Sequence, residues 1–117
     1  MTPLVLAATV GLGAVGAVLR WLVTQALPHA PWWSLGIVNI TGSAAIGVVA
    51  ALPEGFWSYP LMIGLAGGLT TFSTLAVLMV PSSAENVARR VVAPLALHVV
   101  AGVVACAAGF IGTTAVL

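Results

Sequence analysis

Four long apolar stretches, separated by short breaks rich in proline and polar residues, account for most of the chain. They lie at Pro3–Thr24, Trp33–Leu52, Tyr59–Val80 and Val91–Val116. Crossing about 30 Å of hydrocarbon takes roughly 20 apolar residues in helical conformation, and each stretch meets this length. The pattern predicts an all-α membrane protein in which residues 1–117 form a single transmembrane domain of four helices.

The composition of the chain points the same way. Of the 117 residues, 62% are hydrophobic and only 4% are charged, whereas a soluble domain is about a quarter charged. So short a chain cannot bury that much apolar surface in a core of its own. With so few charged side chains we expect no enzymatic activity, no catalytic residues and no nucleic-acid partner.

The five charges are three arginines and two glutamates. With four spans, both termini lie on one side of the membrane, and Arg20, Arg89 and Arg90 all fall toward the other side. Cytoplasmic loops carry the excess of Arg and Lys, so this bias predicts that the termini face outwards. Both carboxylates, Glu54 and Glu85, lie in the connections between spans.

Polar side chains within the spans need partners, because an unpaired polar group is costly at membrane depth. Asn39 lies in the second span, one helical turn before Ser43 on the same face. Its amide either bonds to another helix or lines a path for a solute, and an uncharged donor suits a small anion. Arg20 either extends to the interface or pairs with polar backbone. His98 is interpreted as a hydrogen-bonded packing residue.

The third span contains the segment GGLTTFST at positions 67–74. Two adjacent glycines followed by hydroxyl and β-branched residues weaken a helix. We therefore expect the third helix to be broken at its centre, where irregular backbone survives only against protein, water or an ion. The alternative is that the hydroxyls bond back to carbonyls one turn earlier and the glycines serve packing.

Three segments of the chain together carry a family resemblance. They are GAVGAVLR at 13–20, VNITGS at 38–43 and GGLTTFST at 67–74. These segments look like the signature regions of the Fluc/CrcB family of fluoride channels, and the resemblance covers essentially the whole chain. It implies a channel that exports fluoride passively across the prokaryotic plasma membrane and so lowers cytoplasmic fluoride and its toxicity.

The resemblance also implies an antiparallel, dual-topology dimer of four-helix subunits with two pores. The residues that it places at a fluoride pore are Asn39, Phe72, Ser73, Thr74 and Arg20. Phe72 would offer its ring edge to the anion, and Arg20 would lie by the vestibule. The backbone carbonyls of Gly67 and Thr70 would hold a structural Na⁺ at the dimer centre.

The chain departs from the family pattern at several positions. Leu75 and Leu78 stand where the motif usually has a second Phe and an acidic residue, and His98 and Gly102 stand where a Tyr and a Ser are expected. Leu75 cannot present an aromatic edge to an anion. Together with the one-sided arginines, these losses favour a heterodimer with a different subunit of opposite orientation; a homodimer is the alternative.

Two other classes of protein compete with a fluoride channel. Small multidrug exporters also have four spans, but they couple export to protons through a carboxylate in the first span, which this chain lacks. A non-conducting assembly subunit would use the closely spaced small residues Ala7/Gly11, Ser43/Gly47 and Gly64/Gly68 for packing. That class gives no reason for a broken third span.

Overall fold

The computed structural model describes residues 1–80 and 88–117, and over these ranges the chain is helical with no strand. Its elements are α1 (Pro3–Ala26), α2 (Pro31–Ala51), the π-helical segment η1 (Pro60–Ala66), α3 (Gly67–Leu69), α4 (Ser73–Leu78), the π-helical segment η2 (Ala88–Val92) and α5 (Ala93–Thr114). The expected loop position of Glu85 lies outside the described residues.

Four helical stretches are long and apolar enough to cross a membrane, which confirms the four expected spans. They are Pro3–Ala26, Pro31–Ala51, Pro60–Leu78 and Ala93–Thr114. Each has a proline in its first two positions, where the missing N–H removes no helical hydrogen bond. For this reason α2 begins two residues before the expected start at Trp33.

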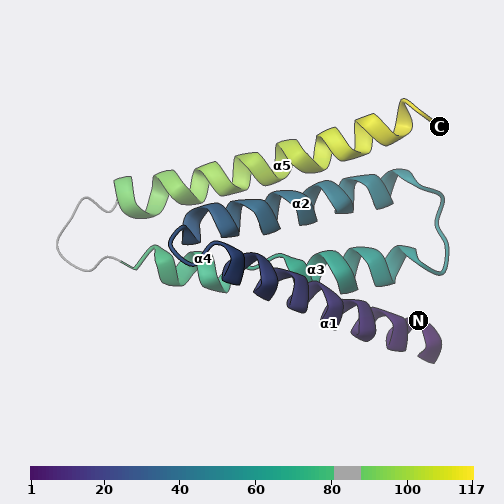
Figure 1. Ribbon diagram of the computed structural model, residues 1–117. Coiled ribbons are helices and arrows are strands. Elements are labelled where there is room, and N and C mark those ends of the chain that lie inside the picture. Colours follow the sequence, from purple (N-terminus) through teal and green to yellow (C-terminus); the bar gives the residue numbers. More distant parts are fainter. Residues whose placement is uncertain (81–87) are drawn as a thin grey trace.

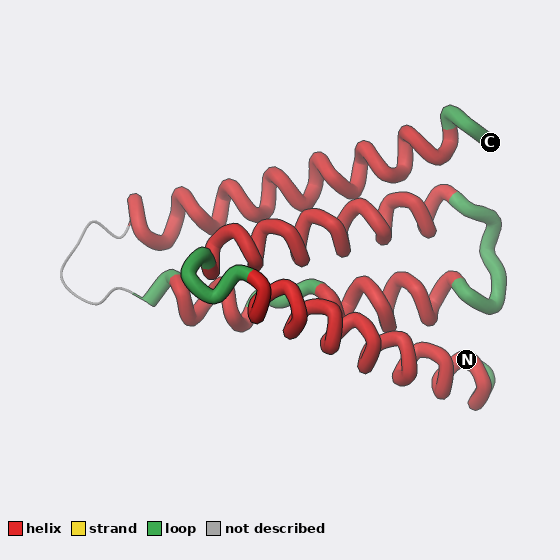
Figure 2. The backbone as a smooth tube through the Cα atoms, in the orientation of Figure 1, coloured by secondary structure: helices red, strands yellow, loops and turns green. Residues whose placement is uncertain are grey.

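The four spans form two pairs (Figures 1 and 2). Helix α5 packs mainly along α2, and α1 crosses η1 and α3. Both termini lie at one end of the molecule, and the connection from α1 to α2 lies at the other end. Arg20 and Arg89 belong to elements that reach this second end, α1 and η2.

Glycines allow the backbones to touch in both pairs. In the α1 pair, a Cβ on Gly68 would collide with the backbone of Gly13, and a Cβ on Gly64 would collide with the carbonyl of Thr9. In the α2–α5 pair, a Cβ on Gly47 would collide with the carbonyl of Cys106. Gly64/Gly68 and Ser43/Gly47 therefore lie at helix contacts, as their spacing predicts.

The expected contact at Gly11 is not found within this chain, because an added Cβ there meets nothing within 4 Å. The α1 crossing is instead built on Gly13 and Gly16, which face the third span. The spacing of small residues indicated that the helix at Pro3–Ala26 packs closely, but it did not indicate which face of that helix makes the contact.

Few large side chains are buried by these contacts. The hydrophobic cluster consists of Leu35, Leu75 and Met79, with Leu78, Val91 and Leu95 partly buried against it. Within α5 no residue is buried, and apolar side chains such as Val103 and Ile111 remain more than 60% exposed. An exterior this apolar is one that lipid or a second subunit covers.

The glycine contact at the α1 crossing gives the first prediction. Gly68→Ala should lower the free energy of unfolding in detergent by about 1–3 kcal/mol, because α1 must move away from the third span. Gly11→Ala is the matched control, since it carries the same gain in helix propensity, about 1 kcal/mol, without a collision. Equal thermal stability of the two variants would contradict the close crossing.

Candidate functional site

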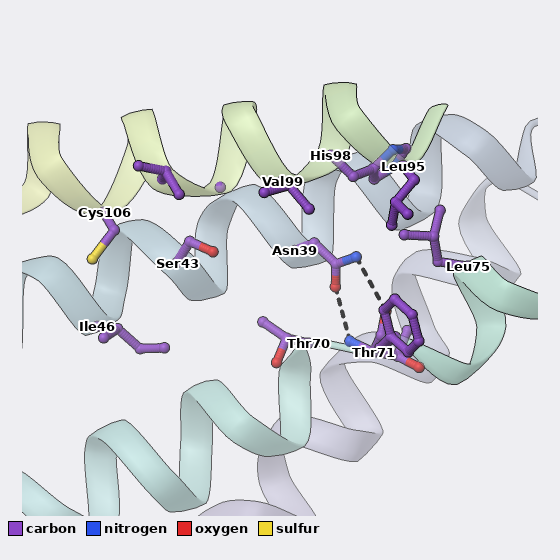
Figure 3. A pocket seen from close by; sticks show the side chains of 13 residues that line it. Asn39, Ser43, Ile46, Thr70, Thr71, Leu75, Leu95, His98, Val99 and Cys106 are labelled. Carbon is purple, nitrogen blue, oxygen red and sulfur yellow. Dashed lines mark hydrogen bonds between the residues drawn. The ribbon is translucent and has the colours of Figure 1, made fainter. Parts of the chain in front are cut away.

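A cavity of about 430 Å³ lies between α2, α5 and the segment that joins α3 to α4 (Figure 3). Its lining residues are Asn39, Ser43, Ile46, Thr70, Thr71, Phe72, Leu75, Leu95, His98, Val99, Gly102, Val103 and Cys106. Among the residues that the structure describes, no Asp, Glu, Lys or Arg lines it, so its polar character comes from amide, hydroxyl, thiol and imidazole groups.

Asn39 is held against the backbone of Thr71 by two hydrogen bonds. Its Nδ2 donates to the Thr71 carbonyl at 3.2 Å, and its Oδ1 accepts from the Thr71 N–H at 2.8 Å (Figure 3). The two positions are 32 residues apart and lie on different spans. Asn39 thus joins two helices, which is the first of the two roles open to it, and it also lines the cavity.

The backbone leaves helical conformation beside this amide. Thr70 has φ −78° and ψ 155°, and α4 begins only at Ser73. Thr70 is accommodated by Gly42 on α2, since a Cβ at Gly42 would collide with the Thr70 side-chain methyl. The sequence GGLTTFST therefore places an extended residue where α2 offers both a polar partner and space.

A small hydroxyl cluster follows the extended residue. The Thr71 hydroxyl lies 3.2 Å from that of Ser73 and 3.3 Å from that of Thr74, and it also accepts from the Thr74 N–H at 3.4 Å. These hydroxyls bond to each other, whereas the alternative interpretation had them bonding to carbonyls one turn earlier. Ser73 and Thr74 are exposed and lie beside the cavity without lining it.

Phe72 stands between Thr71 and Ser73 in the chain. Its side chain is 67% exposed although it is large and apolar. It is one of the residues that line the cavity, together with Asn39. Most of the side-chain surface is therefore available to a solute or to a second subunit.

Arg20 pairs with polar backbone within the protein. Its Nη1 donates to the Thr70 carbonyl at 3.0 Å, linking α1 to the extended residue. The side chain is half-buried and carries a positive charge to the segment that Asn39 holds from the other side. Arg20 does not line the cavity itself.

The carbonyls of Gly67 and Thr70 have the chemistry that Na⁺ prefers, because both are neutral, hard oxygen donors. The Thr71 N–H would bond to Gly67 in a continuous helix, but it donates to Asn39 instead. Gly67 is exposed, and the Thr70 oxygen keeps a second lone pair beyond the bond from Arg20. These two carbonyls therefore have the donor chemistry that would fit Na⁺.

The departures from the family pattern have structural counterparts. Leu75 is 3% exposed and packs in the cluster with Leu35, so an apolar side chain at this position belongs to the core and also lines the cavity. Gly102 leaves room for Ser43, whose hydroxyl would lie 3.2 Å from an added Cβ.

His98 is the site residue whose place in the cavity the sequence did not indicate. Its Nδ1 bonds to the Pro94 carbonyl at 2.9 Å, as expected of a packing residue. However, its Nε2 is buried without a partner, and the ring lines the same cavity as Asn39 and Phe72. A lone histidine in an apolar helix was the available signal.

The fold and the cavity define a small polytopic membrane protein with an uncharged polar site between its helices. The family described as CrcB-like protein, Camphor Resistance (CrcB), matches residues 7–110, and the chain belongs to this family. It is a multi-pass membrane protein, and in bacteria the membrane is the plasma membrane.

Similar proteins from several bacteria carry the name of an ion channel. The chain is 37% identical to the fluoride-specific ion channel FluC of Rhodospirillum centenum, over 87% of this chain and 90% of that protein. It is 35% identical to the protein of the same name from Marinobacter nauticus, over 92% and 91% of the two chains. With that of Nitrobacter winogradskyi it shares 41% identity, over 56% of this chain and 60% of the relative. No solved structure matches the chain.

The Asn39–Thr71 pair gives the second prediction. In Asn39→Asp the Thr71 N–H keeps an acceptor, but the second carboxylate oxygen faces the Thr71 carbonyl. The free energy of unfolding in detergent should fall by about 1–3 kcal/mol, and the Thr71 amide should exchange hydrogen faster.

Gln25→Glu is the matched control for that variant, because it makes the same amide-to-carboxylate change at an exposed position in the last turn of α1. Its effect should stay within about 0.5 kcal/mol. If both variants unfold alike, the Asn39 amide does not hold the segment.

Proposed function

We propose that this protein is a fluoride-selective channel that exports fluoride passively across the plasma membrane and thereby lowers its cytoplasmic concentration and toxicity. The observation that carries the proposal is the cavity in which Asn39 and Phe72 meet without any charged side chain. This chain matches two relatives over about nine tenths of their length, and both are named fluoride-specific ion channels. Their names support the choice of anion.

The chemistry of the cavity suits a small, strongly hydrated anion. Asn39 carries a second N–H beyond the one that it donates to Thr71, and the hydroxyls of Ser73 and Thr74 can rotate to donate. The edge of the Phe72 ring is electropositive. Neutral donors of this kind replace part of a hydration shell and bind loosely enough for the ion to leave.

Charge is arranged in favour of an anion. The four helices contain no Asp or Glu, so the positive charge of Arg20 beside Thr70 is not opposed by a carboxylate within the spans. A carboxylate at membrane depth is what a proton-coupled exporter of cations requires. Arg20 is proposed to raise the local concentration of anions at the vestibule.

The third span is proposed to be broken at its centre so that its free carbonyls face a second subunit. Gly67 and Thr70, with the equivalent residues of that subunit, would hold a structural Na⁺. Bound there, the cation would supply positive charge to carbonyls that have no helical donor. Asn39 and Arg20 hold the extended backbone in place.

The functional unit is proposed to be an antiparallel dimer with two pores along the subunit interface. The exposed apolar faces of α1 and α5 leave ample surface for such a contact. Because Leu75 and Leu78 replace an aromatic and an acidic residue, we favour a heterodimer in which a different subunit supplies those groups. A homodimer remains the alternative.

Replacing the ring at the cavity tests the fluoride path. Phe72→Ile should lower fluoride efflux from proteoliposomes about 2- to 13-fold, the equivalent of an aromatic contact worth about 0.5–1.5 kcal/mol. Phe56→Ile is the control, because Phe56 lies in the connection between α2 and η1, away from the cavity. Unchanged flux in Phe72→Ile would favour the non-conducting assembly subunit.

The composition of the dimer is tested by reconstituting this chain alone. If a second kind of subunit supplies the missing aromatic edge, efflux from the chain alone should be at least about tenfold slower than when it is co-expressed with an oppositely oriented relative. Full fluoride efflux from the chain alone would establish a homodimer instead.

A further inference from the structure

His98 is held in the cavity wall in one orientation. It lies on α5, one turn after Pro94, and its Nδ1 is 2.9 Å from the Pro94 carbonyl oxygen. That oxygen can only accept, so Nδ1 must carry a proton. In the neutral ring, Nε2 therefore presents a lone pair.

This lone pair has no partner among the described residues. Nε2 is buried, although the ring lines the cavity that contains Asn39 and Phe72. A buried, unpaired nitrogen is unfavourable, and this cost disappears once the nitrogen engages a ligand. Because the lone pair repels anions, the neutral ring offers fluoride nothing.

We propose that His98 binds fluoride together with one proton, so that the cavity takes up H⁺ and F⁻ as a pair; this inference rests on the proposed fluoride channel. Protonation at Nε2 converts the repelling lone pair into an N–H donor directed at the anion. The composition is the same whether the pair is written as imidazolium and F⁻ or as imidazole and HF. The one bond formed in the protein is Nε2–H, its proton comes from water or from HF, and no bond within the protein is broken.

The charged and titratable groups around His98 make its protonation depend on the anion. Helix α2 has none, α4 has none, and Cys106 is the other titratable group on α5 that lines the cavity. Arg89 on η2 lines a neighbouring groove with His98, and Arg20 on α1 bonds to Thr70. Among the described residues no carboxylate faces the ring, so a bound anion is the available counter-charge.

Two neighbours favour the paired state. The indole of Trp32 lies 6.0 Å from the His98 ring, centroid to centroid, within the range over which an aromatic ring stabilises a cation. Leu95, one turn from His98 on α5, is half-buried and lines the same cavity, and movement of this side chain is the access that we propose for an ion to Nε2. The protein thus has a place for the charge and a means of access.

The proposal is tested by adding fluoride to the purified, reconstituted protein in weakly buffered solution with a pH indicator. We expect uptake of about one proton per bound fluoride. Because one proton is taken up with each fluoride, the apparent affinity for fluoride should rise by up to about tenfold between pH 8 and pH 7. Protein-free vesicles give the background carried by HF itself.

Two substitutions distinguish the effect of His98 from that of a histidine elsewhere in the protein. His98→Gln supplies a permanent neutral N–H donor, so fluoride binding should persist with no proton uptake and no change in affinity between pH 8 and pH 7. His29→Gln is the matched control, because His29 is the other histidine and lies exposed in the connection from α1 to α2. It should behave as the unmodified protein does.

The outcomes distinguish this inference from the proposed function. Fluoride binding without proton uptake by the unmodified protein would overturn the role of His98 and leave the fluoride channel standing. This result does not depend on whether the Gln variant folds. Failure to bind or conduct fluoride at any pH would overturn the proposed function, and the inference with it.

Discussion

The two hydrogen bonds between the Asn39 side chain and the Thr71 peptide are the interaction on which the site depends. Within a membrane an unsatisfied peptide group costs several kcal/mol, so a chain cannot leave helical conformation there without a substitute partner. Asn39 supplies both a donor and an acceptor to one residue. Because Asn39 takes the place of the helical partners of Thr71, Thr70 can be extended, the carbonyl of Gly67 is left free and Phe72 lies in an outward position.

Glycine contacts determine where this segment can lie. The α2–α5 contact at Gly47 and the α1 crossing at Gly68 bring backbones together in two separate pairs. Between the pairs, Gly42 admits the side chain of Thr70 to the surface of α2, next to Asn39. A larger residue at Gly42 would push the extended segment away from the amide, so packing and polar pairing are parts of one arrangement.

Much of the fold could be predicted because span length and proline position are local properties of the chain. The partners of Asn39 and Arg20 could not, since these bonds join residues 32 and 50 positions apart. The sequence indicated that Asn39 and Arg20 each needed a polar partner, but it did not indicate which residues those partners are. Leu75 shows the reverse case: it departs from the family motif, yet its burial beside Leu35 explains an apolar residue there. The unpartnered Nε2 of His98 depends on the orientation of one ring, which no pattern of residue types specifies.

The scarcity of charged side chains affects how the cavity would bind and release an anion. A fixed positive charge lining the cavity would hold an anion strongly and slow its exit. Arg20 lies outside the cavity, where its guanidinium donates to the Thr70 carbonyl, so in the proposed channel it would attract anions without binding them in the path. Within the cavity the cationic group would be one that gains its charge only with the anion and loses it when the anion leaves. A site of that kind binds fluoride more tightly in acid, where HF entry loads a cell with fluoride, and releases it without a permanent charge to overcome.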